Sequence, residues 1–138
     1  MTKVFLDTSY AIALSFPNDE FHPKAKQVAV WLDRNRIQIV TTRAILLEIG
    51  NSLSKEQYRR QAVDLLSTLE SETLVEVLPL SDELYFKAFA LFKSRMDKQW
   101  GLVDCVSYIA IEESGINQVL TADRHFQQMG FRALLRED

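Results

Sequence analysis

Four acidic residues lie in or beside apolar stretches of the chain, where a carboxylate is unusual. They are Asp7 after the run 4–6, Glu48 within 45–49, Asp104 within 102–106 and Asp123 just after 119–122. Carboxylates that converge repel one another unless a positive charge lies between them. We therefore expect these four side chains to meet in space and to hold a divalent metal ion.

Each acid also has an ordinary structural explanation. Asp7 and Asp123 each precede a helical segment, and a carboxylate there could cap the first turn. Asp104 falls in or near the first turn of a helix, where negative charge is favourable whatever the function. Glu48 lies within a helix and could be a partly exposed side chain beside a core face. These explanations are harder to accept together, because three of the acids would lie at one edge of the sheet.

The ligand types indicate which metal to expect. Mg²⁺ and Mn²⁺ prefer oxygen ligands, and two such ions about 3.5–4 Å apart could activate water and stabilise the leaving oxygen of a phosphodiester. Zinc fits less well, because the single cysteine and the two histidines lack the spacing of a zinc motif. We expect Mg²⁺ or Mn²⁺ as the cofactor.

The elements that must position these acids alternate along the chain. Runs rich in β-branched and aromatic residues predict strands, and apolar residues at helical spacing predict helices. The expected strands are 3–6, 37–42, 74–78, 118–121 and 131–135. The expected helices are 10–16, 21–33, 43–53, 55–70, 81–96, 102–113 and 123–129. This alternation predicts an α/β fold with a mainly parallel sheet, and Gly115 should end one helix in the left-handed conformation.

Composition limits the class of protein. The 138 residues fit a single domain, 1–138, and 47% hydrophobic residues suffice for a core. A single cysteine excludes an internal disulfide, and we expect a cytoplasmic protein without a signal peptide or membrane span. The net charge of −3 argues against coating of nucleic acid by bulk charge, but it does not exclude a nuclease.

Taken together and in order, four short segments resemble the PIN domain, in particular the VapC-like ribonuclease toxins. The segments are Phe5-Leu6-Asp7-Thr8-Ser9, Leu47-Glu48-Ile49, Val103-Asp104-Cys105 and Thr121-Ala122-Asp123-Arg124-His125-Phe126. They span essentially the whole chain. The resemblance implies a three-layer sandwich, with a central, mainly parallel sheet of four to five strands flanked by helices.

The resemblance also implies an activity, partners and roles for residues. It implies a metal-dependent endoribonuclease that cleaves RNA, is usually held inactive by a cognate antitoxin, and commonly forms a homodimer. Ser9 and Thr121 match small polar residues that orient the carboxylates. The acidic residues that serve as catalytic groups and metal ligands match Asp7, Glu48, Asp104 and Asp123.

Several further residues are candidates for contact with RNA. Arg43, Lys98 and Arg124 could guide phosphates, although long basic side chains are usually only solvated. Trp100 could stack on a base, or it could cover the core or a dimer contact. His125 adjoins Asp123, and we expect it to pack or cap rather than to act as a general base.

An aromatic run between residues 85 and 92 covers more than one face of its expected helix. Such an excess is what an interface with a second copy or an antitoxin would leave apolar, although a fully buried helix would also produce it.

Three other functions are alternatives to the toxin. A PIN nuclease of RNA processing would have the same residues, and a non-catalytic RNA-binding or scaffold module would keep the same fold. A phospho-accepting signalling domain is disfavoured, because such domains need a late lysine and this chain has none after Lys98.

Overall fold

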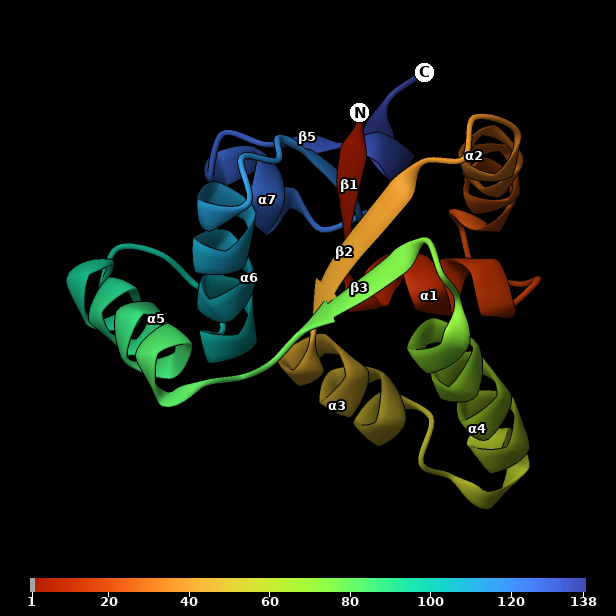
Figure 1. Ribbon diagram of the computed structural model, residues 1–138, viewed down its shortest axis with the longest axis horizontal. Coiled ribbons are helices and arrows are strands. Elements are labelled where there is room, and N and C mark those ends of the chain that lie inside the picture. The colour runs from red at the N-terminus through yellow and green to blue at the C-terminus, as the bar shows by residue number, and fades with distance from the viewer. Residues whose placement is uncertain (1) are drawn as a thin grey trace.

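The computed structural model describes residues 2–138 and contains one five-stranded sheet (Figure 1). Its strands are β1 (Lys3–Leu6), β2 (Gln38–Thr42), β3 (Val75–Leu78), β4 (Gln118–Leu120) and β5 (Arg132–Ala133). The strand order is β3-β2-β1-β4-β5, and every neighbouring pair is parallel. The expected α/β class and mainly parallel sheet are confirmed.

Helices cover both sides of this sheet. They are α1 (Thr8–Ser15), α2 (His22–Arg34), α3 (Arg43–Ser52), α4 (Glu56–Ser71), α5 (Asp82–Ser94), α6 (Leu102–Glu113) and α7 (Arg124–Gln128). In Figure 1, α1, α2 and α4 lie to one side of the strands, and α5, α6 and α7 lie to the other. Helix α3 follows the end of β2 and packs against both α1 and α6. The structure therefore has the expected three layers.

The central strand β1 explains why a short run can anchor the fold. Val4 and Phe5 are fully buried and Leu6 is 3% exposed, so both faces of the strand are covered. A strand buried on both faces needs consecutive apolar residues rather than alternation, which is the pattern of this run. The pairing places Phe5 opposite Val40 of β2 and Val119 of β4.

The order of the strands reverses at β1. From β1 the chain adds β2 and β3 on one side, and it later returns to add β4 and β5 on the other. Such a reversal opens a crevice beyond the carboxyl ends of the two central strands, where α/β folds place their ligands. Leu6 pairs with Leu120, and the Asp7 amide donates to the Leu120 carbonyl at 3.2 Å. The residues that follow β1 and β4 therefore lie side by side.

The expected last strand, 131–135, is wrong in its second half. Only Arg132–Ala133 is a strand, and residues Leu134–Arg136 form a 3₁₀ helix. Leu134 and Leu135 are both buried, at 8% and 3% exposure. Neighbouring side chains of a strand point to opposite faces of the sheet. The 3₁₀ turn instead allows the adjacent side chains of Leu134 and Leu135 both to be buried. Gly115 has φ +69°, which confirms the left-handed end of α6.

A second apolar cluster lies between α5 and α6. Its buried members are Ala44, Leu84, Ala88, Trp100, Cys105 and Val106. The opposite face of α5 exposes large apolar side chains, namely Tyr85 at 37%, Phe86 at 64%, Phe89 at 37% and Phe92 at 42%. The aromatic run is therefore not explained by complete burial of this helix. Within residues 2–138, no helix has the length and apolar character needed to cross a membrane.

Candidate active site

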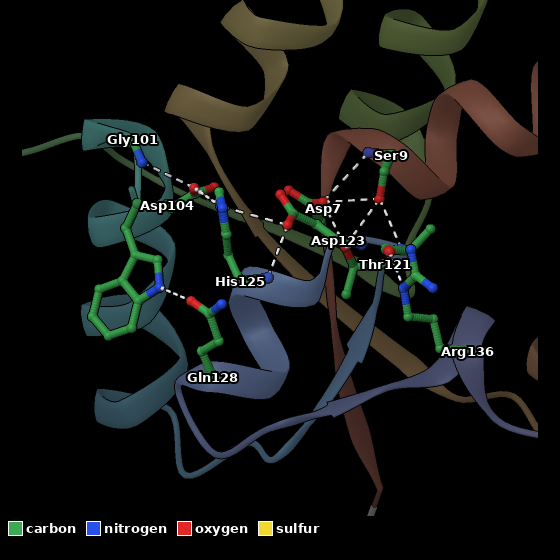
Figure 2. A network of polar contacts seen from close by, with 11 residues as sticks. Asp7, Ser9, Gly101, Asp104, Thr121, Asp123, His125, Gln128 and Arg136 are labelled. Atoms are coloured by element: carbon green, nitrogen blue, oxygen red, sulfur yellow. Dashed lines mark hydrogen bonds and ion pairs between the residues drawn. The ribbon is translucent and has the colours of Figure 1, made fainter. Parts of the chain in front are cut away.

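Asp7 lies at the carboxyl end of β1, where two hydroxyl groups converge on one of its carboxylate oxygens (Figure 2). Thr121 Oγ1 donates to Asp7 Oδ2 at 2.7 Å, and Ser9 Oγ donates to the same oxygen at 3.0 Å. Each hydroxyl also accepts from the backbone, Ser9 from the Ala122 amide and Thr121 from the Asp123 amide, both at 2.9 Å. This network joins the end of β1 to the end of β4 and fixes the orientation of Asp7.

The electrostatic surroundings of Asp7 favour its neutral form. The residue is only 5% exposed. Burial raises the pKa of Asp7 from 3.8 to about 6, against the lowering effect of the hydrogen bonds from Thr121 and Ser9. The negative charges of Asp104 and Glu48 add to the rise in this pKa. The negative charges of Asp104 and Glu48 therefore repel the charged form of Asp7, and a positive charge placed among them would lower the pKa of Asp7.

A second group of ligand atoms lies between α6 and α7. One ligand atom each from Asp104, Asp123 and His125 lies within 4.8 Å of the other two. His125 Nδ1 is 3.0 Å from Asp104 Oδ2 and 3.5 Å from Asp123 Oδ1. Figure 2 shows the imidazole of His125 between the two carboxylates. The Asp104 side chain is 16% exposed and that of Asp123 is 35% exposed, so the group opens to solvent on one side.

Three of the acids also stabilise the start of a helix. Asp7 accepts from the Ser9 amide at the start of α1, and Asp123 accepts from the His125 amide at the start of α7. Asp104 lies in the first turn of α6 and accepts from the Gly101 amide at 3.0 Å. These carboxylates therefore cap helices, and the same side chains are the candidates for the active site. The positive ends of α1, α6 and α7 lower the cost of gathering these carboxylates.

Glu48 reaches the site from α3. Its Oε1 accepts a short hydrogen bond from Thr8 Oγ1, the residue directly after Asp7. Thr8 is buried, whereas Glu48 is partly exposed. Glu48 is thus tied to the start of α1, and its charge acts on Asp7. It is not a member of the close group formed by Asp104, Asp123 and His125.

The contacts of two residues of this site, Thr8 and His125, were not predicted from the sequence. Thr8 donates a hydrogen bond to Glu48. The sequence feature that could have indicated this role is the position of Thr8 directly after Asp7, the acid at the end of β1. His125 was expected to pack or cap, but its ring contacts two of the four acids. The sequence feature that could have indicated the contacts of His125 is its spacing from Asp123, because a residue two positions after an N-cap lies in the first turn of the same helix.

The donor set fits a divalent cation. Asp104, Asp123 and His125 form one close group of ligand atoms, and Asp7 lies outside this group. Burial and the charges of Asp104 and Glu48 disfavour negative charge on Asp7. A bound cation would reverse that penalty, and carboxylate ligands suit Mg²⁺ or Mn²⁺. The imidazole of His125 adds a nitrogen donor beside the oxygens.

The candidates for RNA contact differ in their surroundings. Trp100 is 5% exposed, and its Nε1 donates to Gln128 Oε1 at 2.9 Å, so it covers the core and offers no open face for stacking. Arg43 is exposed but pairs with Glu70. Arg124 is exposed at the start of α7, directly after Asp123. Lys98 is partly buried, with Nζ 6.0 Å from the centre of the Trp100 ring.

The chain shares sequence patterns with known proteins. The model of the PIN domain family matches residues 4–132. Two curated relatives, from the CDC 1551 and H37Rv strains of Mycobacterium tuberculosis, are both named 23S rRNA-specific endonuclease VapC20. Each is 25% identical over 128 residues, which cover 93% of this chain and 95% of the relative.

Solved structures show the same fold. The crystal structure of Mycobacterium tuberculosis VapC20, described as a sarcin-ricin loop cleaving toxin, has a TM-score of 0.81 and 24% identity, covering 93% of this chain and 95% of that one. VapBC2 from Rickettsia felis, bound to a DNA fragment from its promoter, has a TM-score of 0.69 and 15% identity, covering 96% of both chains.

Proposed function

The chain belongs to the PIN domain family, and from this premise we propose that it is a metal-dependent endoribonuclease, the toxin of a toxin–antitoxin pair. The observation that supports this most directly is the ligand group of Asp104, Asp123 and His125 between α6 and α7. Asp7, at the reversal of strand order, has its pKa raised in part by the charge of Asp104. The curated relatives named as an rRNA-specific endonuclease support RNA as the substrate.

In this proposal the acids hold a divalent cation, Mg²⁺ or Mn²⁺. Asp7, Asp104 and Asp123 would be the main ligands, and Glu48 would complete the site or help to hold a second ion. When bound, the cation supplies positive charge that activates a water nucleophile and stabilises charge on the phosphodiester.

The other polar residues orient these ligands. The hydroxyls of Thr121 and Ser9 hold Asp7 Oδ2 and leave its second oxygen free of protein hydrogen bonds among residues 2–138. His125 fixes Asp104 relative to Asp123. Partners of this kind commonly change metal affinity or activity by about 10–100-fold when removed.

The proposal includes protein partners. We expect a cognate antitoxin and a homodimer in the cytoplasm. A complex of VapB and VapC proteins among the structural relatives supports the first. The exposed aromatic face of α5, formed by Tyr85, Phe86 and Phe89, supports a protein interface on this side of the molecule.

A cleavage assay tests the proposed function. Purified wild-type protein should cut RNA when Mg²⁺ or Mn²⁺ is added and should stop when the ion is chelated. Asp104→Asn should lower the cleavage rate by at least about a hundredfold while the circular dichroism spectrum stays unchanged. Asp33→Asn, which changes an exposed acid on α2 outside the cluster, is the matched control. Full activity of Asp104→Asn would refute the proposal.

A further inference from the structure

A cavity of about 250 Å³ lies between the end of α5 and the start of α6, the helix whose first turn carries Asp104. Its lining consists of aromatic, basic and sulfur-containing side chains, namely Phe92, Arg95, Met96, Lys98, Trp100 and Cys105. Two of these residues are sequence neighbours of the site: Trp100 precedes Gly101, the start of α6, and Cys105 follows Asp104. None of the acids described above lines the cavity.

We propose that this cavity binds one nucleobase of the RNA strand, next to the phosphodiester at the acidic cluster. The inference rests on the proposed ribonuclease function and extends it, since it assigns a place where the substrate is held away from the reacting atoms. Such a contact would strengthen the binding of RNA beside the acidic cluster, whichever base is stacked.

The apolar part of the cavity suits a base. Phe92 is 42% exposed and Met96 is 89% exposed, so both offer surface that a flat ring could cover. Trp100 is buried and forms the inner wall, where its stacked contact with Tyr108 holds it in place. Stacking of a base on an exposed aromatic ring tolerates any base, because each base has a π face.

The charged part of the cavity suits a phosphate. Arg95 lies over the Trp100 ring, 4.9 Å from its centre. Its Nε and Nη2 atoms each donate to Asp97 at 3.0 Å, so its charge is matched. Lys98 Nζ lies 6.0 Å from the same ring. Within residues 2–138 Lys98 forms no ion pair. An unpaired lysine beside the aromatic side chains of this cavity complements a nucleotide in a chain whose net charge is −3.

Hydrogen bonds connect the wall of the cavity and the start of α6 to α7 and to Asp104. Trp100 Nε1 donates to Gln128 on α7, and the Gly101 amide donates to Asp104 Oδ2 at 3.0 Å. Figure 2 shows Gly101, Asp104, His125 and Gln128 grouped at the ends of these two helices. A base held in the cavity would therefore have a fixed position relative to Asp104.

A protein partner is the alternative occupant, because Phe92 continues the exposed aromatic face of α5. Phe86 separates the two cases. It is more exposed than Phe92, at 64%, and lies on the same helix, but it does not line the cavity. An RNA contact needs Phe92 and Lys98, whereas a protein interface along α5 would need Phe86 as well.

Binding of a fluorescein-labelled, mixed-sequence RNA of about 12 nucleotides tests the proposal by fluorescence anisotropy. The measurements use the Asp7→Asn background with Mg²⁺, so that the probe stays intact, and light scattering gives the mass of each variant. Phe92→Ala should weaken binding by at least about fivefold, while Phe86→Ala should stay within about twofold of the parent. Lys98→Ala should lower the slope of log affinity against log salt by about 0.7, which Lys26→Ala should not. With an abasic probe of equal length, Phe92→Ala and the parent should bind alike.

Unchanged binding of RNA by Phe92→Ala would overturn the proposal. So would an equal loss in Phe92→Ala and Phe86→Ala accompanied by a fall in mass, because that result assigns the whole face to a protein interface. If only the proposed ribonuclease function is wrong, the result differs from both of these outcomes. Wild-type protein would then not cut RNA, but Phe92→Ala would still bind RNA more weakly than its parent.

Discussion

Asp7 bears most of the electrostatic cost of the acidic cluster. Its burial and the charges of Asp104 and Glu48 raise its pKa to about 6, whereas its hydrogen bonds to Thr121 and Ser9 act in the opposite direction. The folded chain therefore holds this proton more tightly than the unfolded chain does. The stability that Asp7 contributes is fully present below about pH 4 and is lost as the pH rises through about 6.

Replacement of Asp7 by asparagine, which stays neutral at every pH, should remove the loss of stability that occurs as the pH rises through about 6. At about pH 8 with a chelator present, we expect Asp7→Asn to raise the free energy of unfolding by about 1–3 kcal/mol, and at about pH 4 the difference should vanish. Urea denaturation at both pH values measures this, and Asp33→Asn, an exposed acid on α2, is the control. A wild type that is the more stable of the two at pH 8 would contradict the electrostatic account.

At the scale of residues, the four acids could be proposed from the sequence, and the family resemblance added Ser9 and Thr121. The contacts of Thr8 and His125 with these acids could not be predicted. Asp7, Asp104 and Asp123 could be found because each follows or lies within an apolar segment. The contact of His125 with two carboxylates depends on the angle between α6 and α7, which no local pattern encodes. Trp100 could not be assigned from its polar neighbours, because its burial comes from α5 and α7, on either side of it in sequence.

At the scale of elements, the site is assembled from helix starts. Helices α1 and α7 each begin directly after an acid, and α6 begins two residues before one. Each of these acids accepts a backbone hydrogen bond at its helix start. The strands and long helices were predictable, because consecutive apolar residues and helical spacing are strong signals. The 3₁₀ turn Leu134–Arg136 was not, because its cause is the burial of two adjacent leucines against a distant part of the chain.

The hydrogen bond between Trp100 and Gln128 should hold α6 and α7 in register. Trp100→Phe keeps the aromatic packing and removes the Nε1 donor, so we expect a loss of about 1 kcal/mol and a fall in Tm of about 3–5 °C. In the Gln128→Leu background the same substitution should cost less, because the partner is already absent. Differential scanning calorimetry measures both, and strictly additive losses would show that the bond does not couple the helices. Trp31→Phe, on α2, is the control.

At the scale of the whole molecule, the reversal of strand order at β1 decides where the site lies. It places the ends of β1 and β4 together, and the later helices close over one side of the sheet. The sequence predicted parallel strands but could not predict their order, because the apolar runs of β1, β2 and β4 would pair equally well with several neighbours. The exposed aromatic face of α5 is likewise a property of the packed molecule.

Light scattering tests whether that face joins two copies. We expect a mass twice the 15.9 kDa of one chain. Phe86→Asp should shift the protein towards the mass of one chain, because it puts a charge into an apolar interface, while Val63→Asp on α4 should not. A wild type with the mass of one chain at micromolar concentration would contradict a stable homodimer.

The most direct test of the whole account is a calorimetric titration of the metal-free wild type with Mn²⁺, because it measures the site without depending on the choice of RNA. We expect saturable binding that Asp104→Asn abolishes and Asp97→Asn preserves, with both variants folded. Equal binding of Mn²⁺ by Asp104→Asn and the wild type, or no binding by the folded wild type, would contradict a metal centre at these carboxylates.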